Sequence, residues 1–385
     1  MTAAALLAVG GVFNNTGGVT IAGGQAGAAA RLVVAGASPG VLIGTYNIVA
    51  NAGTAAVQWG SGGITQAGDG ANSGADLLLD GTKAFAELGA TNSNSALTNL
   101  GTIASNGLVD LRDGVAVTTA GSLTVVGGGR LKVDAYGGSG GSDVTLGGDL
   151  VNGSSGSFGD GGVAVGSGNI TTGDTLTIDG VVNNAGGILD ITGGHAGATA
   201  RMIVTGAAAS TLTGQYNVAG GADGAVLQYG SGDITQIGDG ANSGGGLFID
   251  GANAFVEVGV TNSNSALDSL GTIAGNGILD LRDDVTVTTT GNLTVLGGDG
   301  RLKVDAYGGA GGSAVTIGGD LTNGSFGNFG DGGVSVGNGN MSVGDTLTVN
   351  GSFTDTGGLL TLNGGQIGAA ARMVMTGAVA ATLTG

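Results

Sequence analysis

Residues 60–74, GSGGITQAGDGANSG, return almost unchanged as residues 230–244, GSGDITQIGDGANSG, 170 positions further along the chain. The register continues, because TNSNSALTNLGTIASNG at Thr91 matches TNSNSALDSLGTIAGNG at Thr261. A single inserted residue then moves the shift to 171 positions for the rest of the unit. A unit this long, copied without a linker, predicts a repeat architecture in which neighbouring units stack on one another.

The repeat divides the chain into two full units and two partial ones. The expected boundaries are 1–18 for the tail of a preceding unit, 19–187 and 188–358 for the full units, and 359–385 for the head of a further, truncated unit. The apolar start of the chain belongs to this series, since LLAVGGVFNNTGG matches TLTIDGVVNNAGG, and it lacks the basic residues of a signal peptide. We therefore expect a piece of a longer array whose capping and targeting segments lie outside it.

Composition indicates an all-β chain. Of the 385 residues, 89 are Gly and one is Pro, and aromatic residues make up only 4%. Of the 28 acidic residues, only Glu87 and Glu257 are glutamates, so the remainder are aspartates. Asp, Asn and Gly favour tight turns, whereas the helix-forming Glu and Lys are rare, so helices are not expected.

Short segments with alternating apolar and polar residues recur between the glycine-rich turns. In RLKVDAY, residues 130–136, the apolar side chains at 131, 133 and 135 share one face, and the polar side chains at 130, 132, 134 and 136 share the other. Such a strand is expected to bury one face and to leave the other in water. With no segment that could form a crossover helix, the pattern predicts a parallel β-helix, or β-solenoid, built from sequence repeats of about 170 residues. We expect turns of roughly 20 residues around a core of stacked Leu, Val, Ile and Ala.

The charge balance and composition exclude several functions. Ten basic residues stand against 28 acidic ones, for a net charge of −18, so the surface repels nucleic acid. The lack of cysteine rules out disulfide bonds and thiolate metal sites. No stretch reaches about 18 uninterrupted apolar residues, so no transmembrane helix is expected in this chain.

Two segments carry a resemblance to known proteins. LTIDGVVNNAGGILDITGG, residues 176–194, and LTNLGTIASNGLVDL, residues 97–111, are turn-rich and favour Asp over Glu. They resemble bacterial surface proteins with β-strand repeats, above all autotransporter passenger domains and filamentous-haemagglutinin-like adhesins. The resemblance implies export to the outside of the cell, an outer-membrane translocator elsewhere in the full protein, and glycans or proteins on host or neighbouring cells as partners. The chain itself has no recognisable translocator, secretion signal or adhesive module.

Charged residues at repeated positions are the first candidates for chemistry, because parallel β-helix enzymes that act on polysaccharides carry carboxylates on their outer face, and glycosidases need two carboxyl groups at a defined separation. The candidates are Asp110, Arg112, Asp113, Lys132 and Asp134, with their copies Asp280, Arg282, Asp283, Lys303 and Asp305. An active site is usually single, whereas a structural ladder is copied with its repeat. The duplication therefore favours an outward-facing network of ion pairs, and no catalytic residue is predicted. The two units show no divergence that would mark a substrate cleft.

Most basic residues belong to the same repeat. Lys83 is the exception, because its copy is Asn253. These cations are expected to neutralise neighbouring carboxylates at the surface, where each pair contributes about 0–1 kcal/mol. Recognition of an anionic glycan is the alternative. The nine repeated positions are Arg31, Arg201, Arg372, Arg112, Arg282, Arg130, Lys132, Arg301 and Lys303.

His195 is the only histidine of the chain. The equivalent positions hold Gln25 and Gln366, which cannot act as general bases. We therefore expect His195 to be a polar surface residue.

Glycine-flanked aspartates in GDGANSG and FGDGG are weak candidates for Ca²⁺ ligands, because hard cations prefer carboxylate and carbonyl oxygens. The tandem nonapeptide of calcium-binding β-rolls and the EF-hand loop are both absent from the sequence. Turn formation is the first interpretation, a structural Ca²⁺ site is the alternative, and no other cofactor is predicted. The four aspartates are Asp69, Asp239, Asp160 and Asp331.

These observations lead to three functional hypotheses. The leading one is a non-enzymatic structural stalk or adhesin segment of a large secreted or cell-surface bacterial repeat protein. The second is a Ca²⁺-dependent surface-layer or matrix protein, which would share the acidic, cysteine-free composition. The third is a polysaccharide-processing β-helix enzyme.

Overall fold

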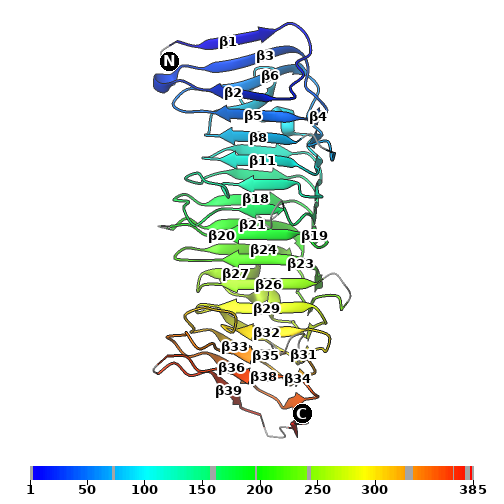
Figure 1. Ribbon diagram of the computed structural model, residues 1–385, viewed down its shortest axis with the longest axis vertical. Coiled ribbons are helices and arrows are strands. Elements are labelled where there is room, and N and C mark those ends of the chain that lie inside the picture. Colours follow the sequence, from blue (N-terminus) through cyan, green and yellow to red (C-terminus); the bar gives the residue numbers. More distant parts are fainter. Residues whose placement is uncertain are drawn as a thin grey trace. The chain divides into compact units, whose positions relative to one another are not determined.

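The computed structural model confirms the predicted fold class: the chain is all-β, with long parallel sheets that form a β-solenoid (Figure 1). The chain forms two compact units, of which the first comprises Met1–Asn183 with Gly187–Thr205 and the second Asn184–Gly186 with Gly206–Gly385. The structure describes residues 3–71, 74–156, 162–195, 197–240, 244–325, 333–366, 368–377 and 382–383.

Strands of the first unit lie on three faces. The long sheet contains β2 (Gly18–Ala22), β5 (Gly44–Val49), β8 (Ala75–Asp80), β11 (Gly107–Arg112), β14 (Arg130–Val133), β17 (Val163–Val165) and β20 (Ile188–Thr192). The second face carries β1 (Ala5–Val9), β3 (Ala30–Ala37), β6 (Ala55–Ser61) and β9 (Ala84–Leu88) and, after an interruption, β12 (Ala116–Thr119), β15 (Asp143–Leu146), β18 (Asp174–Ile178) and β21 (Ala200–Ala207). The third face carries β4 (Val41–Leu42), β7 (Gln66–Ala67), β10 (Thr102–Ile103), β13 (Leu123–Val126) and β16 (Leu150–Gly153), and β19 (Val182–Asn184) follows at the end of the unit.

The second unit repeats this arrangement. Its long sheet contains β23 (Gly214–Ala219), β26 (Gly245–Asp250), β29 (Gly277–Arg282), β32 (Arg301–Val304), β35 (Val334–Val336) and β38 (Leu360–Leu362). Its second face carries β24 (Ala225–Ser231) and β27 (Ala254–Val258) and, after an interruption, β30 (Thr286–Thr289), β33 (Ala314–Ile317), β36 (Thr346–Val349) and β39 (Arg372–Met375). Its third face carries β22 (Thr211–Leu212), β25 (Gln236–Ile237), β28 (Thr272–Ile273), β31 (Leu293–Val295), β34 (Leu321–Asn323), β37 (Phe353–Asp355) and β40 (Thr382–Leu383). The short 3₁₀ turns are η1 (Gln25–Gly27), η2 (Ser95–Leu97) and η3 (Ser265–Leu267).

Each turn of the solenoid takes more residues than the roughly 20 expected. Val109 pairs with Leu77, which lies 32 positions earlier, and with Leu131, which lies 22 positions later. The difference comes from the corners, where loops of unequal length join strands of similar length. One of these loops, TNSNSAL at 91–97, interrupts the second face and shapes the site described below.

Stacked aliphatic side chains fill the interior of the first unit, as predicted. Successive turns of the long sheet align one column, and each of its side chains is at most 2% exposed. Burying an aliphatic side chain of this size contributes about 1.5–3 kcal/mol, so the column is a main source of stability. The column consists of Leu77, Val109, Leu131, Val163 and Leu189.

The strand expected over residues 130–136 is shorter than the alternation suggested. β14 ends at Val133, because Asp134 has a φ of 52° and turns the chain. Lys132 and Asp134, which were expected to face water, are both 0% exposed. The expectation of one wet face is therefore wrong at this strand, because the loop that follows folds back over it.

Glycine is required where a loop passes close to the previous turn. A Cβ atom on Gly129 would lie 2.3 Å from the carbonyl oxygen of Ile103, and one on Gly107 would lie 2.4 Å from that of Ala67. No side chain fits at such distances, so the tight spacing of the turns accounts for part of the high glycine content.

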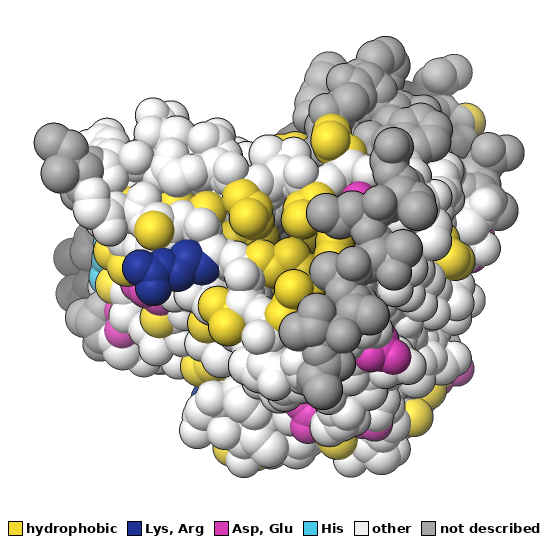
Figure 2. Space-filling model, turned by 90° about the horizontal axis from the view of Figure 1, so that it is seen from below, with side chains coloured by type: hydrophobic (Ala, Val, Ile, Leu, Met, Phe, Trp, Pro, Cys, Tyr) yellow, Lys and Arg dark blue, Asp and Glu magenta, His cyan; other side chains and the backbone are white. Residues whose placement is uncertain are grey.

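The first and last described turns keep apolar side chains at the surface. Leu6 and Leu7 are 70% and 63% exposed in the first unit, and Leu362 and Met375 are 47% and 41% exposed in the second. Figure 2 shows hydrophobic side chains gathered on the C-terminal end of the second unit. Apolar side chains of a solenoid are covered by the adjacent turn, which explains why those of an end turn remain exposed. Within the residues that the structure describes, no helix has the length and apolar character needed to cross a lipid bilayer.

Replacing Leu131 by Asp tests the stacked core. An unpaired carboxylate in this column should lower the free energy of unfolding by at least about 3 kcal/mol, because the interior offers it no partner. Thermal unfolding should show a lower Tm, and limited proteolysis should be faster. Val126→Asp, at a side chain that is 36% exposed, is the control and should change both little. An unchanged Tm and protease resistance for Leu131→Asp would contradict the stacked core.

Candidate functional site

The structure brings together most of the charged residues that the sequence singled out. On β11, the Arg112 Nε atom donates a hydrogen bond of 2.9 Å to Asp110 Oδ2, and Arg112 Nη2 contacts the same oxygen. Lys132 on β14 is the ladder partner of Asp110. Asp110 is 2% exposed and Lys132 is 0% exposed. The ion pair between Asp110 and Arg112 is therefore present, but the prediction that the charged residues face outward into water is wrong for Asp110 and Lys132.

A tyrosine explains the burial of the lysine. The Lys132 Nζ atom lies 5.2 Å from the centre of the Tyr136 ring, a cation–π contact. The copy in the second unit repeats it, because Lys303 Nζ lies 5.2 Å from the Tyr307 ring and donates a hydrogen bond of 2.9 Å to Ser335 Oγ. The loop that carries each tyrosine thus covers the charged face of the preceding strand.

Three aspartates hold this loop in the first unit. Asp134 Oδ1 accepts a hydrogen bond of 2.9 Å from the Asp113 amide, and Asp113 Oδ1 accepts one of 2.5 Å from the Ser139 amide. Asp174, at the start of β18, accepts hydrogen bonds of 2.8 and 3.1 Å from the Gly141 and Ser142 amides. The carboxylates therefore act as anchors for the backbone of the loop.

Asp134 and Asp174 form a buried carboxyl pair. Both are 0% exposed, and a side-chain hydrogen bond joins the two carboxyl groups when one of them is protonated. Burial, together with the nearby Asp134 carboxyl, raises the pKa of Asp174 to about 8. In the second unit, burial and the nearby Asp305 carboxyl raise the pKa of Asp345 to about 7. Asp174 therefore holds a proton at neutral pH, and Asp345 is about half protonated there.

Sequence reasoning missed Asp174 and Asp345. Both stand in the repeated segment GDTLT, at residues 173–177 and 344–348, so the repeat itself carried the signal. Asp174 lies about 40 positions after Asp134 in the sequence, so only the fold brings the two together.

The predicted histidine and Ca²⁺ sites are exposed where the structure describes them. His195, Gln25 and Gln366 are all exposed, as expected. Asp69 Oδ1 accepts a hydrogen bond of 2.9 Å from the Ala71 amide, which is turn formation. Asp160 and Asp331 lie outside the described residues. Across the ranges that the structure describes, no group of three or more His, Asp or Glu side chains is arranged to hold a metal ion.

Other repeated cations contact carboxylates or tyrosine. Arg31 pairs with Glu87, and Arg301 Nε donates a hydrogen bond of 3.0 Å to Asp299 Oδ1. Asp299 is the residue that is inserted before β32 in the second unit. In the first unit, which lacks this aspartate, Arg130 instead donates a hydrogen bond of 3.0 Å to the Tyr136 hydroxyl.

The interruption of the second face forms a further site. The ladder stops after β9 and resumes at β12, and the loop 91–97 with η2 lies between them. Asn94 replaces the missing ladder hydrogen bonds. Its Oδ1 atom accepts a hydrogen bond of 2.9 Å from the Ala86 amide, and its Nδ2 atom donates one of 2.9 Å to the Ala116 carbonyl. One amide side chain thus joins two strands that do not pair with each other.

The second unit has the same bridge. Asn264 Oδ1 accepts a hydrogen bond of 2.9 Å from the Val256 amide, and Asn264 Nδ2 donates one of 2.9 Å to the Thr286 carbonyl. Glu257, which is 0% exposed, accepts hydrogen bonds of 2.8 and 2.7 Å from the Thr261 and Asn262 amides. The two glutamates of the chain, Glu87 and Glu257, therefore both serve to hold this loop.

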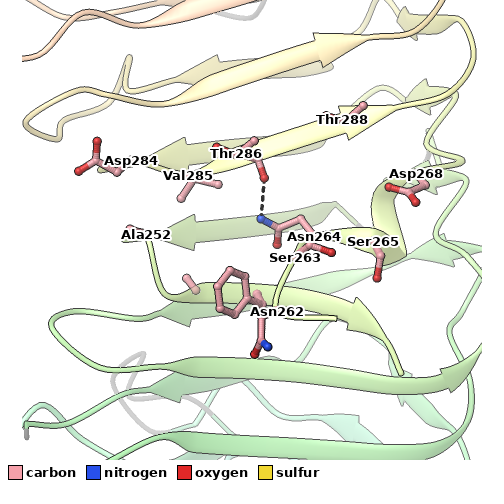
Figure 3. A pocket seen from close by; sticks show the side chains of 12 residues that line it. Ala252, Asn262, Ser263, Asn264, Ser265, Asp268, Asp284, Val285, Thr286 and Thr288 are labelled. Atoms are coloured by element: carbon pink, nitrogen blue, oxygen red, sulfur yellow. Dashed lines mark hydrogen bonds between the residues drawn. The ribbon is translucent and has the colours of Figure 1, made fainter. Parts of the chain in front are cut away.

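A groove of about 630 Å³ lies at this interruption in the second unit, and we call it the η3 groove. Asp284 and Asp268 lie on opposite sides of Asn264 in it (Figure 3). Its other lining residues are Ala252, Ala254, Phe255, Asn262, Ser263, Ser265, Val285, Thr286 and Thr288.

The two units differ at this groove, although comparison of the sequences had shown no cleft. Asp268 replaces Thr98 of the first unit, and Asp284 replaces Gly114. The differences lie 16 positions apart in the sequence, among many identical residues, and only the fold places both on the walls of one groove. The expectation that no divergence marks a cleft is therefore wrong.

No protein-family model, curated protein or solved structure matches the chain.

The buried pair Asp134–Asp174 makes stability fall as pH rises. The folded-state pKa of Asp174, about 8, lies above the unfolded value of about 3.9, so the folded chain holds a proton that the unfolded chain has released. This contribution is complete below about pH 4 and is lost as pH rises through about 8. The Tm should fall between pH 5 and pH 9, and Asp174→Asn should flatten part of that decline. Asp143→Asn, at an exposed position, should leave it unchanged. Superimposable profiles for wild type and Asp174→Asn would contradict the shared proton.

Asn264→Ala tests the amide bridge. The substitution leaves the Val256 amide and the Thr286 carbonyl without their partner, so the free energy of unfolding should drop by about 1–3 kcal/mol. Hydrogen exchange at the Val256 amide should become faster. Ser263→Ala, at an exposed side chain in the same loop, should change neither quantity. Equal protection at Val256 in both variants would mean that the bridge is not needed.

Proposed function

We propose that this chain is a non-enzymatic structural segment of a large exported bacterial surface protein, in which it forms part of a stalk or adhesin. The observation that carries the proposal is that both units repeat the same internal structure. The ladder Leu247–Leu279–Leu302 of the second unit has the same register as Leu77–Val109–Leu131 of the first. Both units also repeat the same Asp–Arg ion pair, in which only the aspartate is buried, and both bury the same lysine and carboxyl pair.

Burial of the charged residues supports a structural role. Asp110, Lys132 and Asp134 are at most 2% exposed. A catalytic carboxylate has to reach its substrate, directly or through one water molecule. Residues so enclosed are suited to anchoring loops, and an arrangement that is copied with each unit fits a scaffold better than a single active site.

Repetition also suits a mechanical element. Each turn contributes ladder hydrogen bonds and apolar contacts to its neighbours, so a solenoid can be lengthened by units without a new fold. The net charge of −18 keeps copies apart in solution and on a crowded surface. In this proposal the translocator lies elsewhere in the full protein, and the partners are glycans or proteins on host or neighbouring cells.

Surface display tests the proposal. The chain is fused to an outer-membrane anchor in a Gram-negative host, with an epitope tag at its free end. The epitope should be accessible on intact cells and should survive trypsin, because a folded solenoid keeps its few Lys and Arg residues in ordered backbone. The Leu131→Asp fusion should lose the epitope under the same treatment. Retention of the wild-type fusion inside the cell, or its digestion as fast as the variant, would contradict the proposal.

Addition of Ca²⁺ separates this function from that of a surface-layer protein. The purified chain should show the same β-type circular dichroism and the same mass by light scattering with and without millimolar Ca²⁺. Folding or sheet assembly that requires Ca²⁺ would overturn the stalk or adhesin role in favour of a Ca²⁺-dependent matrix protein.

A further inference from the structure

We propose that the η3 groove of the second unit binds a saccharide that carries a protonated amine. The proposal deepens the adhesin part of the proposed function by giving this segment a ligand of its own. The binding proposal can be wrong while the proposed function holds, because a solenoid without a ligand would still serve as a stalk.

The groove offers polar groups that the fold does not use. Asn262, Thr286 and Thr288 are exposed on its walls, and among the described residues their side chains form no hydrogen bond. Phe255 lies half-buried among them. Amide and hydroxyl groups around an aromatic side chain match a sugar, which presents hydroxyl groups at its edge and C–H groups on its face.

The groove is also held in shape before any ligand arrives. Asn264 ties the loop to the strands on both sides, and buried Glu257 fixes the amides at the start of the loop. Asn262 has a φ of 49°, so its backbone is fixed in a left-handed conformation. A site formed in advance loses less conformational entropy on binding, which favours recognition of a small ligand.

Charge selects the kind of sugar. Asp268 and Asp284 are both exposed in the groove, and in the described part of it no Lys or Arg lines the walls. Asp233 is close enough to Asp268 to act on it electrostatically, which adds negative potential at that end. Anionic sugars are repelled, whereas an ammonium group gains a charge-assisted contact with either carboxylate.

Comparison of the two units shows that the residues at this end of the groove differ. In the first unit, a Cβ atom on Gly114 would lie 2.7 Å from the Thr82 methyl carbon, so an acidic side chain there would require Thr82 to move. In the second unit, Thr82 is replaced by Ala252 and Gly114 by Asp284. The smaller side chain and the new carboxylate occur together, as a binding site requires. Asp284, with a φ of 65°, occupies the same left-handed conformation as Gly114.

Calorimetric titration of the full chain at about pH 6 tests the proposal. The probes are the β-1,4-linked disaccharide of glucosamine and its N-acetylated counterpart, which has the same shape without the charge. Wild type should bind the glucosamine disaccharide at least tenfold more tightly than the acetylated one. The variant Asp268→Thr/Asp284→Gly, which restores the residues of the first unit, should lose at least tenfold in affinity. Ala252→Thr should weaken binding by filling the groove.

A charge-matched control excludes general attraction to an acidic protein. Asp143→Ala/Asp179→Asn removes two exposed carboxylates of the first unit and installs the residues found at the same positions of the second. Affinity should be unchanged in this variant, and both this variant and Asp268→Thr/Asp284→Gly should keep the wild-type Tm.

Three results would overturn the proposal. No binding of the glucosamine disaccharide by a folded wild-type chain would remove the site but leave the stalk function untouched. Equal losses in the groove variant and the charge-matched control would mean non-specific attraction. Binding of trilysine with the same affinity and the same sensitivity to Asp268→Thr/Asp284→Gly would mean that the groove recognises ammonium groups on a peptide and not a sugar.

Discussion

The parallel hydrogen-bonded ladder between successive turns is the constraint on which the rest of this protein depends. It places each residue about 4.8 Å from its partner in the next turn, so every interior column must hold side chains of similar size. Leu77, Val109 and Leu131 meet this requirement in one column. The ladder also aligns the side chains on the outer face of adjacent turns, so like charges at paired positions would repel each other. Asp110 therefore lies beside Lys132 and not beside another aspartate.

The interruption of the second face shows how the ladder tolerates an insertion. A loop of seven residues separates two strands, and the side chain of Asn94 or Asn264 supplies the two hydrogen bonds that the strands would have exchanged. Because the amide and the buried glutamate hold the backbone, the exposed positions around them are free to vary. The carboxylates of the η3 groove, Asp268 and Asp284, occupy such positions. The asparagine and glutamate that hold the loop are thus the same in both units, whereas the exposed residues at the positions of Asp268 and Asp284 differ.

Burial of charge follows from the same geometry. The loop after β14 folds over the outer face, where its Ser139 amide donates a hydrogen bond to Asp113 and its Gly141 and Ser142 amides donate to Asp174. This arrangement brings Asp134, where the loop begins, next to Asp174, and burial then favours the protonated form of Asp174. Their proximity is a consequence of anchoring a loop, and the dependence of stability on pH is a consequence of their proximity.

The sequence by itself determined the fold class, the repeat and the residues that recur, because hydrophobic alternation and a period of about 170 residues are properties of the chain alone. It also indicated that Asp110, Arg112, Lys132 and Asp134 belong together, since the repeat copies them as a set. Only the tertiary structure decided that Lys132 and Asp134 are buried, because the loop that covers them returns from beyond the end of the strand. Only the tertiary structure, likewise, joined Asp134 to Asp174 and gathered Ala252, Asp268 and Asp284 around one groove. Side chains far apart in sequence meet there through the lengths of the corner loops, and no local pattern encodes those lengths.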